Sequence, residues 1–180
     1  MKIIEYKGNY RDDLIFMVLE AKNALGRISS INTVMKIIEY KGNYRDDLIF
    51  MVLEAKNALG RISSINPDLL TIEASYLEKG DRFWLAVNEE NRVIGSIAYS
   101  SIPKTNEVFL HRLFIKPSLK HQGIGSQLLT FAEDYLRKIG KSHVRIHLGQ
   151  PKEQWFESYR FYPKHGYQFY DDTHLIKKLI

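Results

Sequence analysis

The most chemically informative stretch of the sequence is Leu110–Ser126, in which an apolar run ends at a proline, a basic loop follows, and two glycines open an amphipathic helical pattern. Gln122–Ser126 reads Gln-Gly-Ile-Gly-Ser, and glycines at such a point let the backbone approach a ligand closely. The first N–H groups of a helix have no partner within the helix and attract anions. With Lys120 and His121 beside them, these groups predict a site for a phosphate or pyrophosphate.

Two common nucleotide-binding motifs do not fit this stretch. The dinucleotide fingerprint needs a third glycine where Leu128 stands, and an acidic residue where Arg145 stands. Gly140–Ser142 imitates the end of a P-loop, but the earlier glycine that motif requires is Tyr135, and the segment follows a helix and precedes a strand, which is the reverse order. The sequence therefore favours a different phosphate-bearing ligand.

The hydrophobic pattern places this loop in a domain of short strands and helices. Strands are expected at Lys36–Tyr40, Phe83–Val87, Val93–Ser101, Glu107–Ile115, His143–Leu148, Tyr167–Tyr170 and His174–Leu179. Helices are expected at Tyr44–Leu59 with Asn43 as its cap, at Pro67–Glu78, at Gly123–Ile139 and at Pro151–Tyr162. This order of elements predicts a mixed α+β fold.

Three segments together resemble motifs of the GNAT N-acetyltransferase superfamily. Lys120–Gly125 resembles the Arg/Gln-x-x-Gly-x-Gly/Ala sequence that wraps the pyrophosphate of acetyl-coenzyme A in that family, with a lysine as its first residue. Val93–Ile97 resembles the family's third strand, and Phe161–Tyr167 resembles its Phe-Tyr-x-x-x-Gly-Phe segment. The resemblance extends over Met35–Ile180 and implies an acetyl-CoA-dependent N-acetyltransferase. It also implies a mixed, largely antiparallel sheet of six to seven strands flanked by about four helices.

The resemblance further implies which residues bind the donor, acetyl-CoA. The pantetheine arm is expected to add to the backbone of Leu113, Phe114 and Ile115 like an extra strand. The pyrophosphate is expected on the loop residues Lys120, His121, Gln122, Gly123, Ile124, Gly125 and Ser126. Trp155 occupies a position where relatives often carry a cofactor-binding asparagine. No metal site is expected.

Transfer of an acetyl group to an amine requires both a base and an acid. An alkylamine, with a pKa near 10.4, must lose a proton before it attacks the thioester, and the expelled thiolate, with a pKa of about 8.5, must gain one. The resemblance assigns the acid to Tyr162. Phe109 occupies the position of the family's glutamate and cannot act as a base. Glu107 and His111 share its strand face and are the two candidates for the base, acting directly or through a water molecule.

The composition is typical of a globular enzyme and excludes several other classes. The chain has 44% hydrophobic and 26% charged residues and no cysteine, which excludes disulfide scaffolds, thiolate zinc sites and cysteine nucleophiles. No apolar run approaches the roughly 20 residues of a membrane span, and no export signal is recognised, so we expect a cytoplasmic protein that binds no membrane. The net charge of +5 suits an anionic ligand but is too scattered to indicate nucleic-acid binding.

Two functional interpretations stay open at this point. The favoured one is an enzyme that acetylates a primary amine of a small molecule or a peptide, and the alternative is an acyl-CoA-binding or regulatory domain without catalytic activity. Detection of thiol release from acetyl-CoA would discriminate between them.

The sequence also contains an internal duplication. Met1–Asn32 recurs letter for letter as Met35–Asn66, with Thr33 and Val34 between the copies. Two copies are too few for a helical-repeat array, and nothing after Asn66 continues the period. We therefore expect a single acetyltransferase domain in Met35–Ile180. Residues 1–34 are expected to be a redundant copy of its first strand and helix, whose apolar face can support domain swapping or a homodimer.

Overall fold

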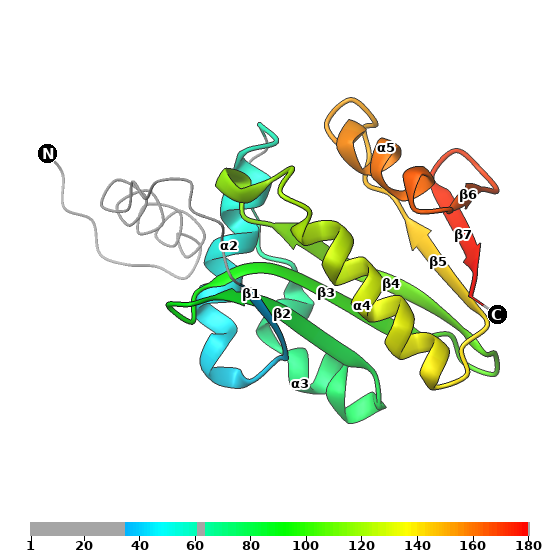
Figure 1. Ribbon diagram of the computed structural model, residues 1–180, viewed down its shortest axis with the longest axis horizontal. Helices are drawn as coiled ribbons and strands as arrows, with labels where there is room; N and C mark the ends of the chain where they lie inside the picture. Colours follow the sequence, from blue (N-terminus) through cyan, green and yellow to red (C-terminus); the bar gives the residue numbers. More distant parts are fainter. Residues whose placement is uncertain (1–34, 61–63, 180) are drawn as a thin grey trace, which may run out of the picture.

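Runs rich in β-branched and aromatic residues form the strands of one seven-stranded sheet. The computed structural model describes residues 35–60 and 64–179 (Figure 1). The strands are β1 (Met35–Glu39), β2 (Arg82–Asn88), β3 (Val93–Ser101), β4 (Glu107–Ile115), β5 (His143–His147), β6 (Gln168–Phe169) and β7 (His174–Lys178). Their order in the sheet is β1-β2-β3-β4-β5-β7-β6, and only the β4–β5 pair is parallel among these described strands. The predicted α+β fold with a largely antiparallel sheet is confirmed.

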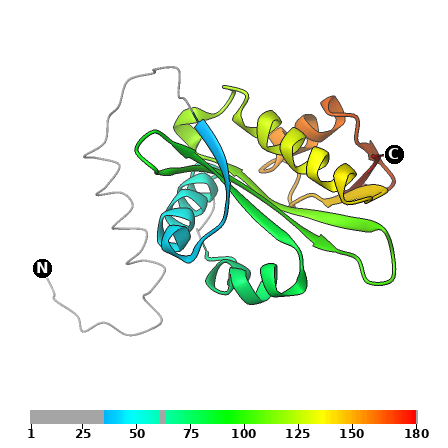
Figure 2. The same ribbon diagram turned by 60° about the horizontal axis from the view of Figure 1, so that its bottom comes forward.

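Helices cover both faces of this sheet. The α-helices of the described residues are α2 (Arg45–Asn57), α3 (Ile72–Ser75), α4 (Ile124–Lys138) and α5 (Phe156–Lys164), and the 3-10 helices are η2 (Gly42–Tyr44), η3 (Pro67–Leu70), η4 (Leu77–Lys79) and η5 (Pro117–Leu119). Figures 1 and 2 show α2 and α3 on one face, and α4 and α5 on the other. The sheet is therefore the middle layer of three.

The alternation of side chains along β2 shows how the two faces are filled. Phe83 and Leu85 are fully buried in the cluster that contains the α2 side chains, whereas Trp84 and Ala86 are buried in the cluster beneath α4. Successive side chains of a strand point to opposite faces, so one continuous apolar run supplies both cores.

Close packing against β3 fixes the position of α4. Leu128 is fully buried on the sheet-facing side of this helix. A Cβ added to Gly95 on β3 would lie 3.0 Å from the Leu128 Cδ1 atom and 3.0 Å from the Ile115 Cδ1 atom. The glycine thus allows the helix to approach the sheet, and this places the N-terminus of α4 beside the C-terminal end of β4.

Two irregularities of β4 open the middle of the sheet. The described pairing between β4 and β5 is confined to Glu107, Val108 and Phe109 of β4, after which the two strands diverge. On its other side, β4 carries a bulge opposite Ile97 of β3, where Arg112 adopts a left-handed backbone conformation with φ 55°. The strand therefore bends away from β5 beyond Phe109.

Three helical segments differ from the sequence-based expectations. The helix expected at Pro67–Glu78 is broken into η3, α3 and η4, because Thr71 (φ −139°) and Tyr76 (φ −130°) leave the helical region of backbone conformation. Asn43 lies within η2 and makes no side-chain cap to α2, which begins at Arg45. Finally, α5 begins at Phe156 and not at the predicted Pro151.

The downstream copy of the duplicated segment forms β1 and most of α2 in this fold. The upstream copy, residues 1–34, lies outside the described residues, as do the expectations about swapping or dimerisation that depend on it. Across residues 35–60 and 64–179, the helices are all too short or too polar to cross a membrane.

Candidate functional site

The glycine-containing loop leads directly into the N-terminus of α4. His121 and Gly123 both have left-handed backbone conformations, with φ values of 62° and 82°, and they turn the chain from η5 into the helix. No side chain caps the N-terminus of α4, and its first turn carries no acidic residue. The first N–H groups of this helix are therefore oriented as anion donors, as the sequence predicted.

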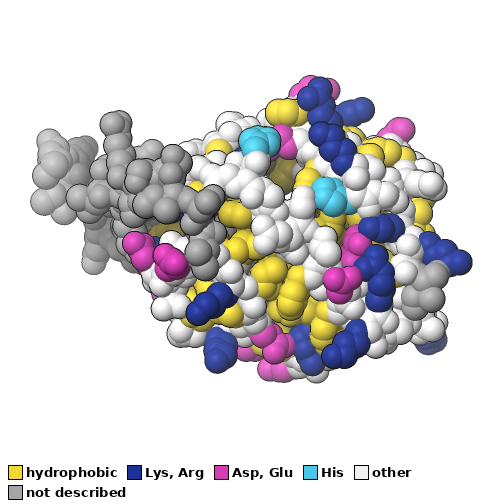
Figure 3. Space-filling view, in the orientation of Figure 1, with side chains coloured by type: hydrophobic (Ala, Val, Ile, Leu, Met, Phe, Trp, Pro, Cys, Tyr) yellow, Lys and Arg dark blue, Asp and Glu magenta, His cyan; other side chains and the backbone are white. Residues whose placement is uncertain are grey.

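A cavity of about 650 Å³, here called the loop cavity, lies between this loop, α5 and the end of β4. Its lining comprises Ala55, Leu59, Leu113–Ile115, Lys120, His121, Gly123, Gly125, Ser126, Trp155–Ser158, Arg160–Tyr162, Lys164 and His165. In Figure 3, Lys and Arg side chains gather over α5 and the loop before it, at the upper right. The only carboxylate in the described lining is that of Glu157, and it accepts a hydrogen bond from the Lys120 Nζ atom at 2.5 Å. The cavity is thus predominantly basic.

Two of the predicted loop residues do not line this cavity. Ile124 is buried in the core beneath α4, and Gln122 is exposed. Gly125 does line it, and a Cβ added there would lie 3.6 Å from the Phe161 ring. Ser126 is joined to α5 through His165, whose Nε2 lies 2.9 Å from the Ser126 Oγ atom and whose Nδ1 lies 2.9 Å from the Phe161 carbonyl oxygen. Because a carbonyl only accepts, Nδ1 carries a proton, and in the neutral ring Nε2 accepts from the serine.

A second cavity, of about 540 Å³, occupies the gap between the diverging ends of β4 and β5 and is here called the β4–β5 cavity. Its lining comprises Lys56, Ser64, Asn66, Leu110–Phe114, Ile146–Gln150, Trp155, Ser158 and Tyr162. Both cavities share Leu113, Phe114, Trp155, Ser158 and Tyr162. The two cavities therefore meet at α5, beside Tyr162.

Tyr162 is the buried member of this junction. Its side chain is 8% exposed, and its ring packs edge-on against those of Phe161 and Tyr167. Burial raises the pKa of the Tyr162 hydroxyl above the ordinary value for tyrosine, because the phenolate would lose its hydration. The hydroxyl thus stays protonated and available as a donor at neutral pH.

The structure places the two candidate bases differently. His111 lines the β4–β5 cavity, and its Nε2 lies 2.8 Å from the Ser100 Oγ atom. Burial, together with the neighbouring Arg112, lowers the pKa of His111, so the ring is neutral near pH 7. Glu107 lines neither cavity. Its carboxylate accepts a hydrogen bond from the Arg145 Nε atom at 2.5 Å, which lowers the pKa of Glu107.

A group of three side chains that sequence reasoning missed holds the β4 bulge. The Arg112 guanidinium donates to both carboxylate oxygens of Asp68, at 2.8 Å and 2.6 Å, and the Tyr76 hydroxyl donates to the same carboxylate at 2.6 Å. Burial opposes ionisation of Asp68, but the hydrogen bonds from Arg112 and Tyr76 outweigh it and lower the pKa of this carboxyl. The Ser96 hydroxyl donates to the Arg112 carbonyl at 2.7 Å. We call Asp68, Tyr76 and Arg112 the bulge clamp.

The wall shared by the two cavities contains a second feature that the sequence did not indicate. A Cβ added to Gly149 would lie only 2.3 Å from the Trp155 ring, so the indole rests directly on the backbone that follows β5. A glycine after a strand carries no such signal by itself. The packing links the β5 side of the gap to the start of α5.

Comparisons with known proteins agree with this geometry. The model of the acetyltransferase (GNAT) family matches residues 51–167. The chain is similar to a solved GNAT-family acetyltransferase from Staphylococcus aureus Mu50, with 24% identity and a TM-score of 0.72, and the match covers 82% of this chain and 100% of that one. No curated protein gives a significant match.

Two further solved structures show the same fold with a ligand bound. One is a GNAT-family acetyltransferase from Brucella melitensis in complex with acetyl-CoA, at 16% identity and a TM-score of 0.60, covering 82% of this chain and 89% of that one. The other is the PaiA N-acetyltransferase from Thermoplasma acidophilum in complex with coenzyme A, at 22% identity and a TM-score of 0.64, covering 81% and 99%. Because the family model spans more than half of the chain, the chain belongs to the acetyltransferase (GNAT) family.

Proposed function

We propose that the protein is an acetyl-CoA-dependent N-acetyltransferase that transfers the acetyl group to a primary amine by direct attack on the thioester. The observation that carries this proposal is the meeting of two cavities beside a protonated tyrosine. One cavity ends at a basic helix N-terminus suited to a diphosphate, and the other opens between two strands. A donor bound in the loop cavity would therefore present its reactive end to the β4–β5 cavity.

The residues around the loop cavity fit the chemical parts of acetyl-CoA. The N–H groups at the start of α4 and the side chains of Lys120 and His121 would bind the diphosphate. The backbone of Leu113–Ile115 would hold the pantetheine arm in the manner of an added strand, because β5 has diverged at this level. Bound acetyl-CoA supplies an activated acetyl thioester.

The β4–β5 cavity would receive the acceptor amine. His111 is neutral near pH 7 and would take a proton from the incoming ammonium group, directly or through a water molecule. If the Nε2–H of His111 donates to Ser100, the Nδ1 lone pair is the accepting atom. Glu107 is not used in this role, because its carboxylate is bonded to Arg145 and lines neither cavity.

Tyr162 would protonate the departing thiolate. Its raised pKa alone would make it a weak acid toward a thiol of pKa about 8.5, but burial disfavours the thiolate as well. Both anions lie in the same desolvated junction, so the two acidities are shifted in the same direction. The hydroxyl proton can then pass to the sulfur as the carbon–sulfur bond breaks.

The experiment is a thiol-release assay with acetyl-CoA against polyamines, aminoglycosides, amino acids and peptides with free N-termini. Tyr162→Phe should lower kcat by about a hundredfold, which is the lower range for loss of a general acid, and leave the Kd of acetyl-CoA within about twofold. Tyr170→Phe, at an exposed ring, is the matched control and should leave both unchanged. Normal turnover by Tyr162→Phe would refute the assignment of the acid. Binding of acetyl-CoA without thiol release for any amine would instead identify an inactive acyl-CoA-binding domain.

A further inference from the structure

The β4–β5 cavity carries no carboxylate in the part of its lining that the structure describes. Its ionisable lining side chains are Lys56, Arg112, His111, His147 and Tyr162, and the first two are cationic at neutral pH. The charge of Arg112 is compensated by Asp68 in the bulge clamp, and Lys56 adds a second cation to the lining. The described wall of the cavity that would receive the acceptor is therefore positive and not negative.

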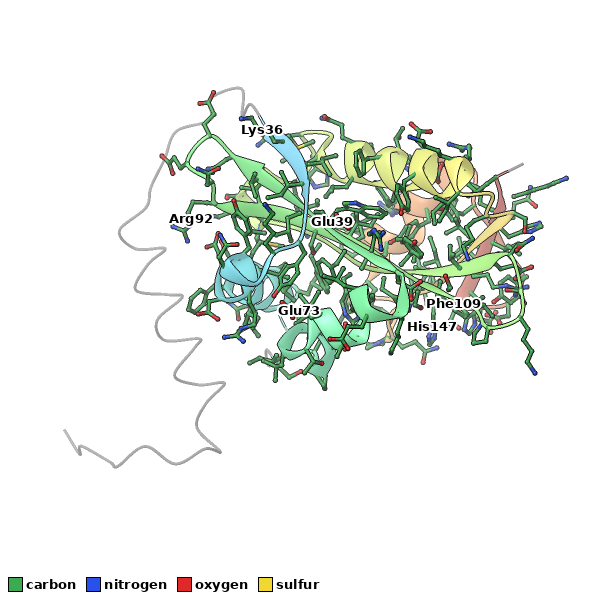
Figure 4. The ribbon with its side chains drawn as sticks, turned by 90° about the horizontal axis from the view of Figure 1, so that it is seen from below. Lys36, Glu39, Glu73, Arg92, Phe109 and His147 are labelled. Carbon is green, nitrogen blue, oxygen red and sulfur yellow. The ribbon has the colours of Figure 1, made fainter. Side chains whose placement is uncertain are left out.

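The acidic residues of the preceding elements are directed elsewhere. Asp68 is bonded to Arg112, and Glu39 on β1 forms an ion pair with the Arg82 Nε atom at 2.8 Å. Glu73 on α3 is exposed. Figure 4 shows Glu39 and Glu73 well apart from His147, which marks the β5 side of the cavity. None of these carboxylates can neutralise an additional cationic group of an acceptor.

Lys56 is positioned to attract an anion. It lies in the last turn of α2, its side chain is only 9% exposed, and its Nζ atom donates to the Ser64 carbonyl oxygen at 2.6 Å. Lys56 and Ser64 both line the cavity. A charge with little water around it acts over a longer distance than an exposed one, because solvent screens it less. A second cation in the cavity would be repelled, and a carboxylate would be attracted.

We infer that the preferred acceptor is an amine that carries a carboxylate elsewhere in the molecule, and that Lys56 determines this preference. The inference rests on the proposed function, since it assigns the acceptor of that same site. Diamines and polyamines are disfavoured, because their second ammonium group would meet a positive lining. The amine end would lie toward His111 and the thioester, and the carboxylate would lie toward the end of α2.

The test uses amines that share one carbon chain and differ only in the terminal group. At each of three chain lengths, an ω-amino acid, its ω-amino amide and the corresponding diamine are compared in the thiol-release assay; 6-aminohexanoate, 6-aminohexanamide and 1,6-diaminohexane form one such set. We expect kcat/KM for the carboxylate to exceed that for the diamine at least tenfold. Lys56→Met should reduce this ratio to about threefold or less, Lys56→Arg should retain it, and Lys138→Met, at an exposed position on α4, should not affect it.

A binding measurement separates this inference from the proposed function. Wild-type and Lys56→Met proteins saturated with coenzyme A are titrated with 6-acetamidohexanoate and 6-acetamidohexanamide, the product-like forms of two acceptors. Tighter binding of the carboxylate by the wild type alone supports the inference even if no amine is turned over, in which case only the proposed function fails. Equal binding of both, equal turnover of all three amines, or a ratio that Lys56→Met leaves unchanged overturns the inference and leaves the acetyltransferase proposal standing.

Discussion

Replacing Asp68 by asparagine tests whether the bulge clamp holds β4 in its active shape. Asp68 lies in η3, and its partner Arg112 is 44 residues away in the chain, at the bulge where the backbone is left-handed. Such a conformation is unfavourable for arginine and persists only where the surroundings impose it. The asparagine side chain would lack the charge and one of the two acceptor atoms that receive the guanidinium. The bulge should then relax toward ordinary strand geometry.

The size of the effect follows from the exposure of the pair. Two unit charges about 4 Å apart interact by ~4 kcal/mol at an effective dielectric constant of about 20. Breaking a fully buried pair costs roughly 3–5 kcal/mol. The Arg112 and Asp68 side chains are 25% and 19% exposed, so solvent screens part of the interaction. We expect Asp68→Asn to lower the free energy of unfolding by about 2 kcal/mol, and the Tm by roughly 4–8 °C.

Urea denaturation and steady-state kinetics measure the two consequences separately. The matched control is Asp134→Asn, which removes an ion pair with Arg137 of similar length (2.7 Å) but with a carboxylate that is 67% exposed, and it should change stability by no more than about 0.5 kcal/mol. Asp68→Asn should also lower kcat by about tenfold or more, with a smaller change in KM. Equal stability of the two variants would refute the anchoring role. A loss of stability with unchanged kcat would show that the clamp is structural only.

The pH dependence of the same variant gives a further check on the sign. The bonds to Asp68 hold its pKa below the ordinary value of 3.8, so the ionised carboxylate stabilises the folded state fully above that value. This contribution is lost as the pH falls through the lower folded-state pKa. The difference in stability between wild type and Asp68→Asn should therefore be constant above about pH 5 and shrink below 3.8.

Three other predictions concern the cavities and the duplicated segment. Gly149→Ala should lower the free energy of unfolding by about 1–3 kcal/mol and shift the tryptophan emission, because the added Cβ would overlap the Trp155 ring; an unchanged urea midpoint would contradict this. The acid limb of the pH profile of kcat/KM should have an apparent pKa below 6.5, because burial lowers the pKa of His111 and only the neutral ring accepts a proton, and His111→Gln should abolish this limb while Glu107→Gln retains it. Deleting residues 1–34 should leave kcat/KM within about twofold, because the second copy supplies β1 and α2; a large loss of activity would show that the first copy contributes to the site.

The parts of the molecule that local sequence determines were predicted well. The bounds of β3 and β4 agree with the expectation, because each is a run of alternating or continuous apolar residues ended by turn residues. The glycine loop and the start of α4 were predicted for the same reason, since a strand, a proline and a glycine-rich helix start follow one another along the chain. The family resemblance drawn from these motifs is confirmed by the match over residues 51–167.

The rest depends on residues far apart in the sequence, which a single chain does not relate to one another. Sequence alternation put Glu107 and His111 on one strand face and could not separate them. Only the divergence of β5 after Phe109 brings one of them to a cavity and leaves the other against Arg145. The clamp of Asp68 on Arg112 gives no local signal at all.

The divergence of β4 from β5 leaves a strand edge in the interior of a sheet, where neighbouring strands normally satisfy one another. Every residue except proline offers the same N–H and C=O groups, so a ligand that pairs with such an edge is insensitive to which side chains the strand carries. Substitutions can accumulate along β4 without erasing the donor site, in keeping with a fold that is preserved at 16–24% identity among the solved structures described above. Acceptor recognition depends on side chains such as that of Lys56, which lies on a separate helix. Mutation can thus change what is acetylated and leave the donor site intact, which makes this architecture readily evolvable.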